Sequence, residues 1–338
     1  MSLGAAMAGV SVRLAIELDR EAFRTYTRNH PNTVVLQADV SAIANLHVPF
    51  DPSDLVVFGG PPCQGFSTSN QRTRSSKNQN NWLFRSFITF VERIRPKWVV
   101  FENVRGILDT ERGIFADEVE KGLQELGYGT ARGLLNACAF GVPQRRSRFF
   151  ILARRGRSAP ALPHQDDVRV VTVAEAIGDL PLLSNGAATS VLPYRMEAVS
   201  AYAKSLRNGR RECANHLVSR NSESVIARYS YIPPGGNWES IPEELMTNYA
   251  DRSRCHTGIY YRLKPDEPSV VIGNFRKNML IHPLENRGLS VREAARLQSF
   301  PDWYEFVGSI GFQQQQVGNA VPPLLAKAVF GTVLGASE

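Results

Sequence analysis

One cysteine of this chain occupies a position in which a nucleophile could be presented to a ligand. Cys63 lies in the loop Gly59–Ser67 (GGPPCQGFS), directly after the predicted strand 54–58. Glycines let a backbone approach a ligand closely, and prolines stiffen the turn. A thiolate held at a strand end can form a covalent bond with a substrate, and nearby cations lower the pKa of such a thiol. A single cysteine is more often a buried structural residue, but the Pro-Pro-Cys-Gln context favours the reactive interpretation.

Two further groups of ionisable residues adjoin predicted strands. Glu102 follows the apolar run Trp98–Phe101, so its carboxylate is expected at a strand end, where it could face the same cleft as the cysteine. A helix cap or a salt bridge would explain a glutamate there equally well. Arg146 and Arg148 lead into the predicted strand 149–153, and period-two spacing predicts that they lie on one side. Alone, such a pair is more often a solvated basic edge.

The elements that must position these residues alternate up to about residue 155. Strands are predicted over 12–17, 33–36, 54–58, 98–101, 133–135 and 149–153, and helices over 20–29, 82–95 and 114–126. This alternation predicts a mostly parallel sheet covered on both faces, with ligands beyond the carboxyl ends of the strands. The chain is loop-rich from 156 to about 255. Regular structure is expected again over 261–272, and helices over 291–298 and 321–334.

Composition bounds the class of protein. The 338 residues are 43% apolar and 21% charged, which is typical of a globular chain of about two domains. The net charge is +7, and only seven of the 39 basic residues are lysine. An arginine-rich chain points weakly to nucleic acid, although a merely soluble basic protein has the same charge. The four cysteines form no Cys-x-x-Cys pair, so neither a metal site nor a disulfide framework is expected. Without a long apolar run or a secretory signal, a cytoplasmic protein with no membrane span is expected.

Taken together, five ordered motifs resemble the cytosine carbon-5 DNA methyltransferases of bacterial and phage restriction-modification systems. They are Pro61–Gln64 (PPCQ), Glu102–Val104 (ENV), Gln144–Arg148 (QRRSR), Arg287–Pro301 and Gln316–Pro323 (QVGNAVPP). The resemblance implies an α/β, Rossmann-like fold dependent on S-adenosylmethionine, with a smaller inserted target-recognition domain. The implied divisions are a catalytic and cofactor-binding domain over 1–160, the recognition domain over 161–258, and a return to the catalytic domain over 259–338.

The resemblance also implies a role for each matching residue. Catalytic roles fall to Cys63, Glu102, Arg148 and, in support, Arg146. Contacts to S-adenosylmethionine are expected from Glu17, Leu18, Asp39, Val40, Pro62, Leu83, Asn319 and Ala320, with Glu17 on the ribose hydroxyls and Asp39 and Val40 at the adenine. DNA contacts are expected from Gln64 and Ser67. Weaker candidates for DNA contact are Arg207, Arg210, Arg211, Arg220 and the turn Pro233–Trp238.

The chain departs from the family at its first residues. The family opens with a strand and a Phe-x-Gly-x-Gly loop that cradles the methionine part of the cofactor, whereas residues 1–9 resemble the helix that follows that loop. A truncated or misassigned start is therefore expected. Loss of that strand would leave unpaired backbone groups on its neighbours, so weak cofactor binding and low stability are expected too.

The implied reaction is methyl transfer to carbon-5 of a cytosine rotated out of duplex DNA, because the atom is inaccessible within the helix. A monomer is expected, with a cognate restriction endonuclease as a partner that acts separately. The alternatives are an RNA (tRNA) cytosine-5 methyltransferase of the same architecture and a catalytically silent DNA-binding homologue. A Rossmann oxidoreductase is set aside, because no Gly-x-Gly-x-x-Gly follows a strand.

Overall fold

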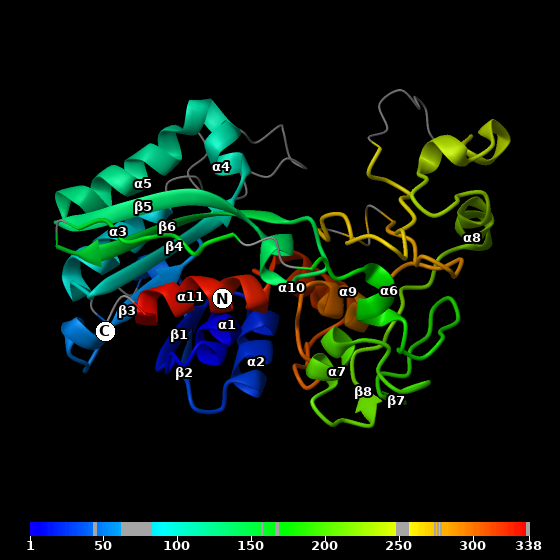
Figure 1. Ribbon diagram of the computed structural model, residues 1–338, viewed down its shortest axis with the longest axis horizontal. Coiled ribbons are helices and arrows are strands. Elements are labelled where there is room, and N and C mark those ends of the chain that lie inside the picture. The colour runs from blue at the N-terminus through cyan, green and yellow to red at the C-terminus, as the bar shows by residue number, and fades with distance from the viewer. Residues whose placement is uncertain are drawn as a thin grey trace.

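The described strands of this computed structural model form one four-stranded sheet, a separate parallel pair and a small antiparallel pair (Figure 1). The structure describes residues 1–42, 46–61, 83–156, 158–165, 169–247, 257–273, 275, 277 and 279–335. The four-stranded sheet has the order β3 (Val56–Gly59), β4 (Trp98–Val104), β6 (Ser147–Arg155), β5 (Tyr128–Asn136). The pair is β1 (Leu14–Glu17) with β2 (Val34–Gln37). The expectation that a strand of the family is missing beside β1 stays a prediction.

Strand direction differs in part from the expected, mostly parallel sheet. β3 and β4 are parallel, but β6 runs antiparallel to both β4 and β5. The connection from β5 to β6 contains only the short 3-10 helix η6 (Ala137–Phe140) and a few further residues. A parallel pairing needs a crossover of about a dozen residues or more, so this short connection favours the antiparallel arrangement.

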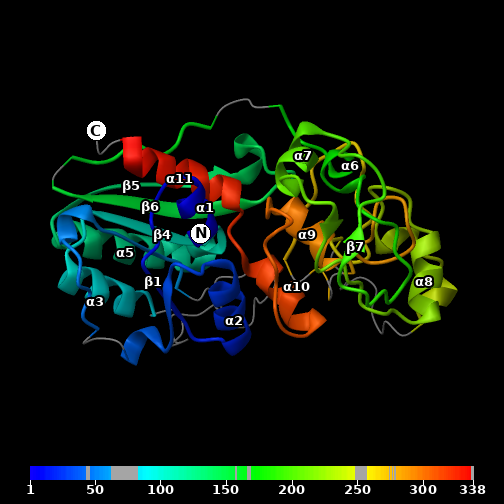
Figure 2. The same cartoon turned by 90° about the horizontal axis from the view of Figure 1, so that it is seen from below.

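Helices cover both faces of the four-stranded sheet, as predicted from the alternation of elements (Figure 2). One face packs against α3 (Phe84–Ile94) and α5 (Ile114–Glu125), and the other against α1 (Ser2–Met7) and α11 (Pro323–Gly335). Alternate residues of β4 enter the two cores, with Val99 and Phe101 on one side and Trp98 and Val100 on the other. The sheet is therefore buried on both faces, and its strand ends are the places where polar side chains can serve a ligand.

The described residues form further α-helices, some beside the sheet and the others in the right half of Figure 1. They are α2 (Arg20–Asn29), which adjoins β1, the short α4 (Gly106–Asp109), and then α6 (Val173–Ile177), α7 (Ala201–Arg207), α8 (Glu223–Ser230), α9 (Val291–Leu297) and α10 (Ile310–Asn319). A small hairpin pairs β7 (Leu192–Pro193) with β8 (Glu212–Cys213). Of these, α2 and α4 belong to the sheet half of the molecule, and the others with the hairpin form the second half.

One core joins residues on both sides of the expected domain boundary at 258. Val173 and Cys213 share a cluster with Leu263, Leu289 and Val317. The expected regular structure over 261–272 has no strand, only isolated bridges at Arg262 and Ser269. That prediction of regular structure was wrong, because this segment satisfies its backbone through single bridges and side chains rather than through a ladder. The proposed domain division stays a prediction.

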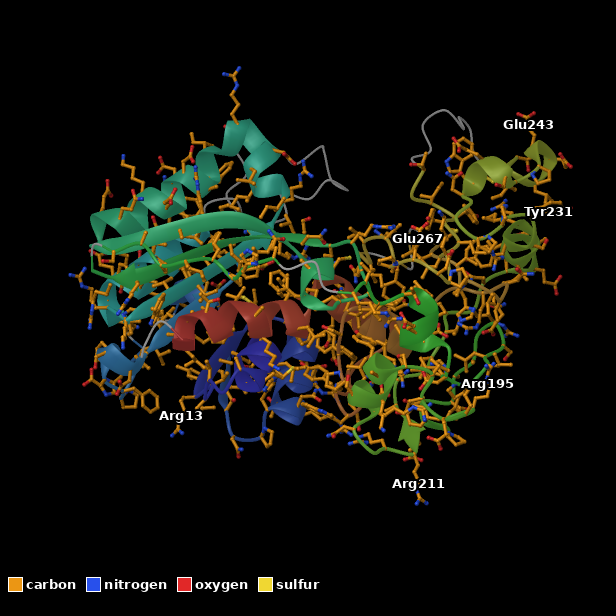
Figure 3. The ribbon with its side chains drawn as sticks, in the orientation of Figure 1. Arg13, Arg195, Arg211, Tyr231, Glu243 and Glu267 are labelled. Atoms are coloured by element: carbon orange, nitrogen blue, oxygen red, sulfur yellow. The ribbon has the colours of Figure 1, made fainter. Side chains whose placement is uncertain are left out.

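A buried ionic cluster holds the second half together. The Arg296 guanidinium lies 2.6 Å from a carboxylate oxygen of Asp179 and 2.6 Å from one of Asp302. Arg207 donates from Nε to Asp179 at 2.6 Å and is 8% exposed. Arg207 therefore points into the core and not toward DNA, which corrects the expectation from sequence. Arg211, by contrast, points outward from this half, as does Arg195 (Figure 3).

No single described helix is both long and apolar enough to cross a membrane, and one bent pair, α10 with α11, meets the length and composition test.

Candidate active site

A buried ion pair joins two neighbouring strands at the edge where β4 ends. Arg148 Nε lies 2.9 Å from Glu102 Oε1, and the two residues are 6% and 8% exposed. The antiparallel register explains the contact, because Arg148 is opposite Val104, two residues along β4 from Glu102 on the same face. The prediction that Glu102 and Arg148 serve one site agrees with this geometry.

Burial controls the charge of this carboxyl. Desolvation raises the pKa of Glu102 above its ordinary value, and the nearby Arg148 guanidinium partly opposes that rise. A carboxyl with a raised pKa can hold a proton and donate it to an acceptor such as a ring nitrogen. The arginine beside it supplies a permanent positive charge for a developing anion.

The loop that carries the cysteine begins against Glu102. A Cβ built on Gly60 would lie 2.6 Å from Glu102 Oε2, which is closer than real Cβ contacts, so a side chain at this position would require Glu102 or the loop to move. One residue on, the Pro61 carbonyl accepts a hydrogen bond of 3.3 Å from Asn103 Nδ2. Cys63 is two positions after Pro61, but it lies outside the described residues, as do Pro62, Gln64 and Ser67. The last residues described before the cysteine, Gly60 and Pro61, therefore lie beside Glu102 and Asn103.

Arg146 does not join the ion pair. Its Nη1 donates to the Ile272 carbonyl and its Nη2 to the Gly318 carbonyl, both at 2.7 Å, and it is 2% exposed. Period-two alternation applies within a strand, but β6 begins at Ser147. The two arginines therefore contact different groups, and their predicted position on one side stays a prediction.

The neighbouring Arg145 forms an ion pair of 2.9 Å with Glu267. Of the arginines in this motif, only Arg148 contacts Glu102 among the described residues.

The cofactor candidates on β1 and β2 share one edge, because the two strands are parallel. Glu17 ends β1 and is half-buried, and desolvation raises the pKa of its carboxyl. Asp39 follows β2 and accepts from the Ser41 amide at 2.8 Å and its hydroxyl at 2.7 Å, which lowers the pKa of Asp39. Asp39 thus begins the 3-10 helix η1 (Val40–Ala42) as a charged group. Leu18 and Val40 expose apolar side chains at this edge, at 65% and 37%.

Three other candidates lie on different elements. Asn319 is the exposed last residue of α10, Ala320 is half-buried after it, and Leu83 is half-buried just before α3. The structure describes no direct contact among them.

Glu17 and Glu102 belong to different sheets, but both act on the buried amino group of Met1. Desolvation lowers the pKa of that amino group, and the two carboxylates partly oppose the lowering. Two tyrosines that the sequence did not indicate also lie near Glu17. Burial raises the pKa of Tyr26 to about 12 and raises the pKa of Tyr304, and the Glu17 carboxylate adds to both increases. No motif or spacing connects residues 26 and 304, so only the fold reveals them.

Within the part of the chain that the structure describes, no group of three or more His, Cys, Asp or Glu side chains could hold a metal ion.

Comparison with known proteins gives a consistent result. The family model described as C-5 cytosine-specific DNA methylase matches residues 1–334. Type II methyltransferase M1.HphI of Haemophilus parahaemolyticus is 36% identical, covering 98% of this chain and 83% of the relative. Type II methyltransferase M.DdeI of Desulfomicrobium norvegicum is 34% identical, covering 97% and 84%. A solved E. coli structure, described as a DNA modification methyltransferase encoded within a prophage, superposes with a TM-score of 0.78 at 23% identity over 100% of this chain and 96% of that one.

Proposed function

This chain belongs to the C-5 cytosine-specific DNA methylase family and is a DNA cytosine-5 methyltransferase, and we propose that it acts through Cys63 with Glu102 and Arg148 on the cytosine ring. The observation that carries this assignment of roles is the buried Glu102–Arg148 pair against which the loop to Cys63 begins. A buried acid and a buried cation held together can stabilise the negative charge that develops on the cytosine ring when a nucleophile attacks it.

The chemistry follows from the poor reactivity of cytosine carbon-5. The Cys63 thiolate attacks carbon-6, and Glu102 donates a hydrogen bond or proton to ring nitrogen-3, so negative charge does not accumulate on the ring. Arg148 holds oxygen-2. Such electrostatic stabilisation contributes on the order of 3 kcal/mol per donor. Carbon-5 then takes the methyl group, a base removes the carbon-5 proton, and Cys63 leaves.

S-adenosylmethionine supplies the methyl group as an electrophilic sulfonium. The residues at the ends of β1 and β2 fit it, since a half-buried Glu17 carboxylate can accept hydrogen bonds from two ribose hydroxyls, and Val40 offers an apolar contact for adenine. Asp39, Leu18, Pro62, Leu83, Asn319 and Ala320 complete the proposed pocket.

The proposed substrate is duplex DNA with the cytosine rotated into the site, at an unstacking cost of a few kcal/mol. Gln64 and Ser67 contact the DNA, and the recognition domain over 161–258 reads the target sequence. The enzyme acts as a monomer, and a restriction endonuclease of the same specificity acts separately. The relatives named above do not favour the RNA alternative.

Trapping with 5-fluorocytosine tests the covalent route. A duplex containing the analogue at the target cytosine, together with S-adenosylmethionine, is expected to give an adduct resistant to denaturation, because fluorine blocks removal of the carbon-5 substituent. Cys63→Ser should abolish the adduct, whereas Cys138→Ser, at a half-buried cysteine elsewhere, should retain it. An adduct that survives Cys63→Ser would refute the assignment.

A further inference from the structure

Three buried side chains connect backbone segments that are far apart in sequence. Besides the two bonds of Arg146 to the Ile272 and Gly318 carbonyls, Gln144 accepts from the Ile272 amide at 3.0 Å and donates to the Leu297 carbonyl at 3.2 Å. Gln298 donates to the Val317 carbonyl at 2.6 Å. Gln144 and Gln298 are 0% exposed. We call Gln144, Arg146 and Gln298 the polar cluster.

The polar cluster holds the end of α10 at a place where two backbone segments are in direct contact. A Cβ built on Gly318 would lie 2.2 Å from the Gly273 carbonyl oxygen, so the end of α10 sits immediately against residues 272–273. Arg146 bonds the carbonyls on both sides of this contact, one on Ile272 and one on Gly318. Hydrogen bonds from a charged donor are shorter and stronger than those between neutral groups, so this guanidinium is the strongest connection at the contact.

The two ends of this connection adjoin different parts of the proposed site. Arg146 is two residues before Arg148, which forms an ion pair with the carboxylate assigned to the cytosine ring. Gly318 precedes Asn319 and Ala320, which are assigned to the cofactor. A shift of α10 relative to β6 would therefore move the cofactor contacts with respect to the base.

We propose that Arg146 is a positioning residue that sets the turn Gly318–Ala320 against the start of β6, and so determines cofactor affinity without touching the cytosine. The proposal rests on the proposed function, because it takes Asn319 and Ala320 as cofactor contacts. It differs from a direct role beside Arg148, since the guanidinium bonds the two carbonyls instead.

Binding of S-adenosylmethionine, measured by calorimetry on the full chain, separates the possibilities. Arg146→Met should weaken binding by about tenfold or more, with the DNA KM within about twofold of wild type. Arg146→Lys keeps the charge and can reach one carbonyl, so its affinity for S-adenosylmethionine should lie between those of the wild type and Arg146→Met. The lysine variant also provides a folded protein if the methionine variant does not fold.

Arg262 offers a matched control, because it is another buried guanidinium that bonds carbonyls. It donates to Ile232 at 2.6 Å, Tyr229 at 2.7 Å and His282 at 2.9 Å, and it is 4% exposed. Arg262→Lys should lower the melting temperature as Arg146→Lys does, yet leave cofactor affinity within about twofold of wild type.

Two outcomes would overturn the proposal. Equal cofactor affinity in wild type and Arg146→Lys, at a lowered melting temperature, would make Arg146 purely structural. Loss of 5-fluorocytosine trapping at saturating cofactor, with unchanged cofactor affinity, would assign Arg146 to the base. Both leave the proposed function standing, whereas a wild-type chain that binds no cofactor and traps no cytosine would overturn that function as well.

Discussion

Adding one methyl group at Gly60 tests the contact between the cysteine loop and the acid. The new Cβ of Gly60→Ala would lie 2.6 Å from Glu102 Oε2 and 3.1 Å from the Glu102 carbonyl, and real Cβ contacts are essentially never under 3.0 Å. The groups must separate by at least 0.4 Å, the difference between 3.0 and 2.6 Å. The carbonyl belongs to β4, which pairs on both sides, so the carboxylate or the loop moves instead. Because a misplacement of about 1 Å can reduce a rate about 100-fold, we expect kcat to fall on the order of 10- to 100-fold.

The assay is methyl transfer from labelled S-adenosylmethionine at saturating DNA, with a melting curve for each variant. Overpacking should cost about 1–3 kcal/mol of stability. Gly59→Ala is the near control, because its Cβ would meet only the edge of the Phe87 ring at 3.2 Å. Gly331→Ala is the far control in α11, with open space around the Cβ, and should stabilise by up to about 1 kcal/mol. A Gly60→Ala enzyme with kcat within about threefold of wild type would contradict the proposed geometry.

Three further predictions concern buried charges. Carbon-13 NMR titration should place the pKa of Glu102 above 4.5, because burial raises it. Arg148→Met should raise this pKa further, because the opposing cation is lost. A pKa below 4.5 would show that burial does not control the charge of Glu102. Burial acts to raise the pKa of Glu293, but the Arg287 guanidinium bonded to it holds that pKa far below its ordinary value. The contribution of Glu293 to stability is therefore present above about pH 4.5 and is lost as the pH falls. The unfolding free energy of Glu293→Gln, measured in urea, should depend less on pH below that value, and an unchanged pH dependence would contradict this prediction. Arg207→Met should lower the free energy of unfolding by on the order of 3 kcal/mol, because Asp179 loses one buried partner. The DNA KM of the folded variant should not change. A selective rise in that KM would indicate that Arg207 contacts DNA.

Local patterns predicted most of the elements around the sheet. The helix 20–29 was predicted with the bounds that α2 has, since Asp19 caps it and its amphipathic pattern is unbroken. The strand expected over 98–101 extends to Val104, because β6 pairs with it along its whole length. Strand direction was not predictable in the same way. It depends on which strands become neighbours, and the pattern of a buried run is the same whichever way its partner runs.

The candidate site shows a similar division. Glu102 and Arg148 were identified because their motifs adjoin strand ends, and the structure brings their side chains together. Arg146 was placed beside them by alternation, but its actual partners come from segments more than a hundred residues away. Tyr26 and Tyr304 were missed, since their proximity to Glu17 depends on how α2 packs against the turn after α9. Long-range packing of this kind leaves no signal in local sequence.

Many arginines of this chain have a structural role that the net charge does not indicate. The arginine content pointed weakly to nucleic acid, yet the described residues include seven arginines that are 8% exposed or less in addition to Arg148: Arg146, Arg207, Arg228, Arg262, Arg287, Arg292 and Arg296. Several bond backbone carbonyls of loops that have no ladder to satisfy them. A guanidinium presents five donors in a rigid plane, so one side chain can bond several carbonyls of irregular chain at once. A lysine in the same place offers three donors on a single atom. The preference for arginine over lysine in this protein therefore reflects, in part, the need to hold a loop-rich half together from within, and its net charge alone overstates the surface available to DNA.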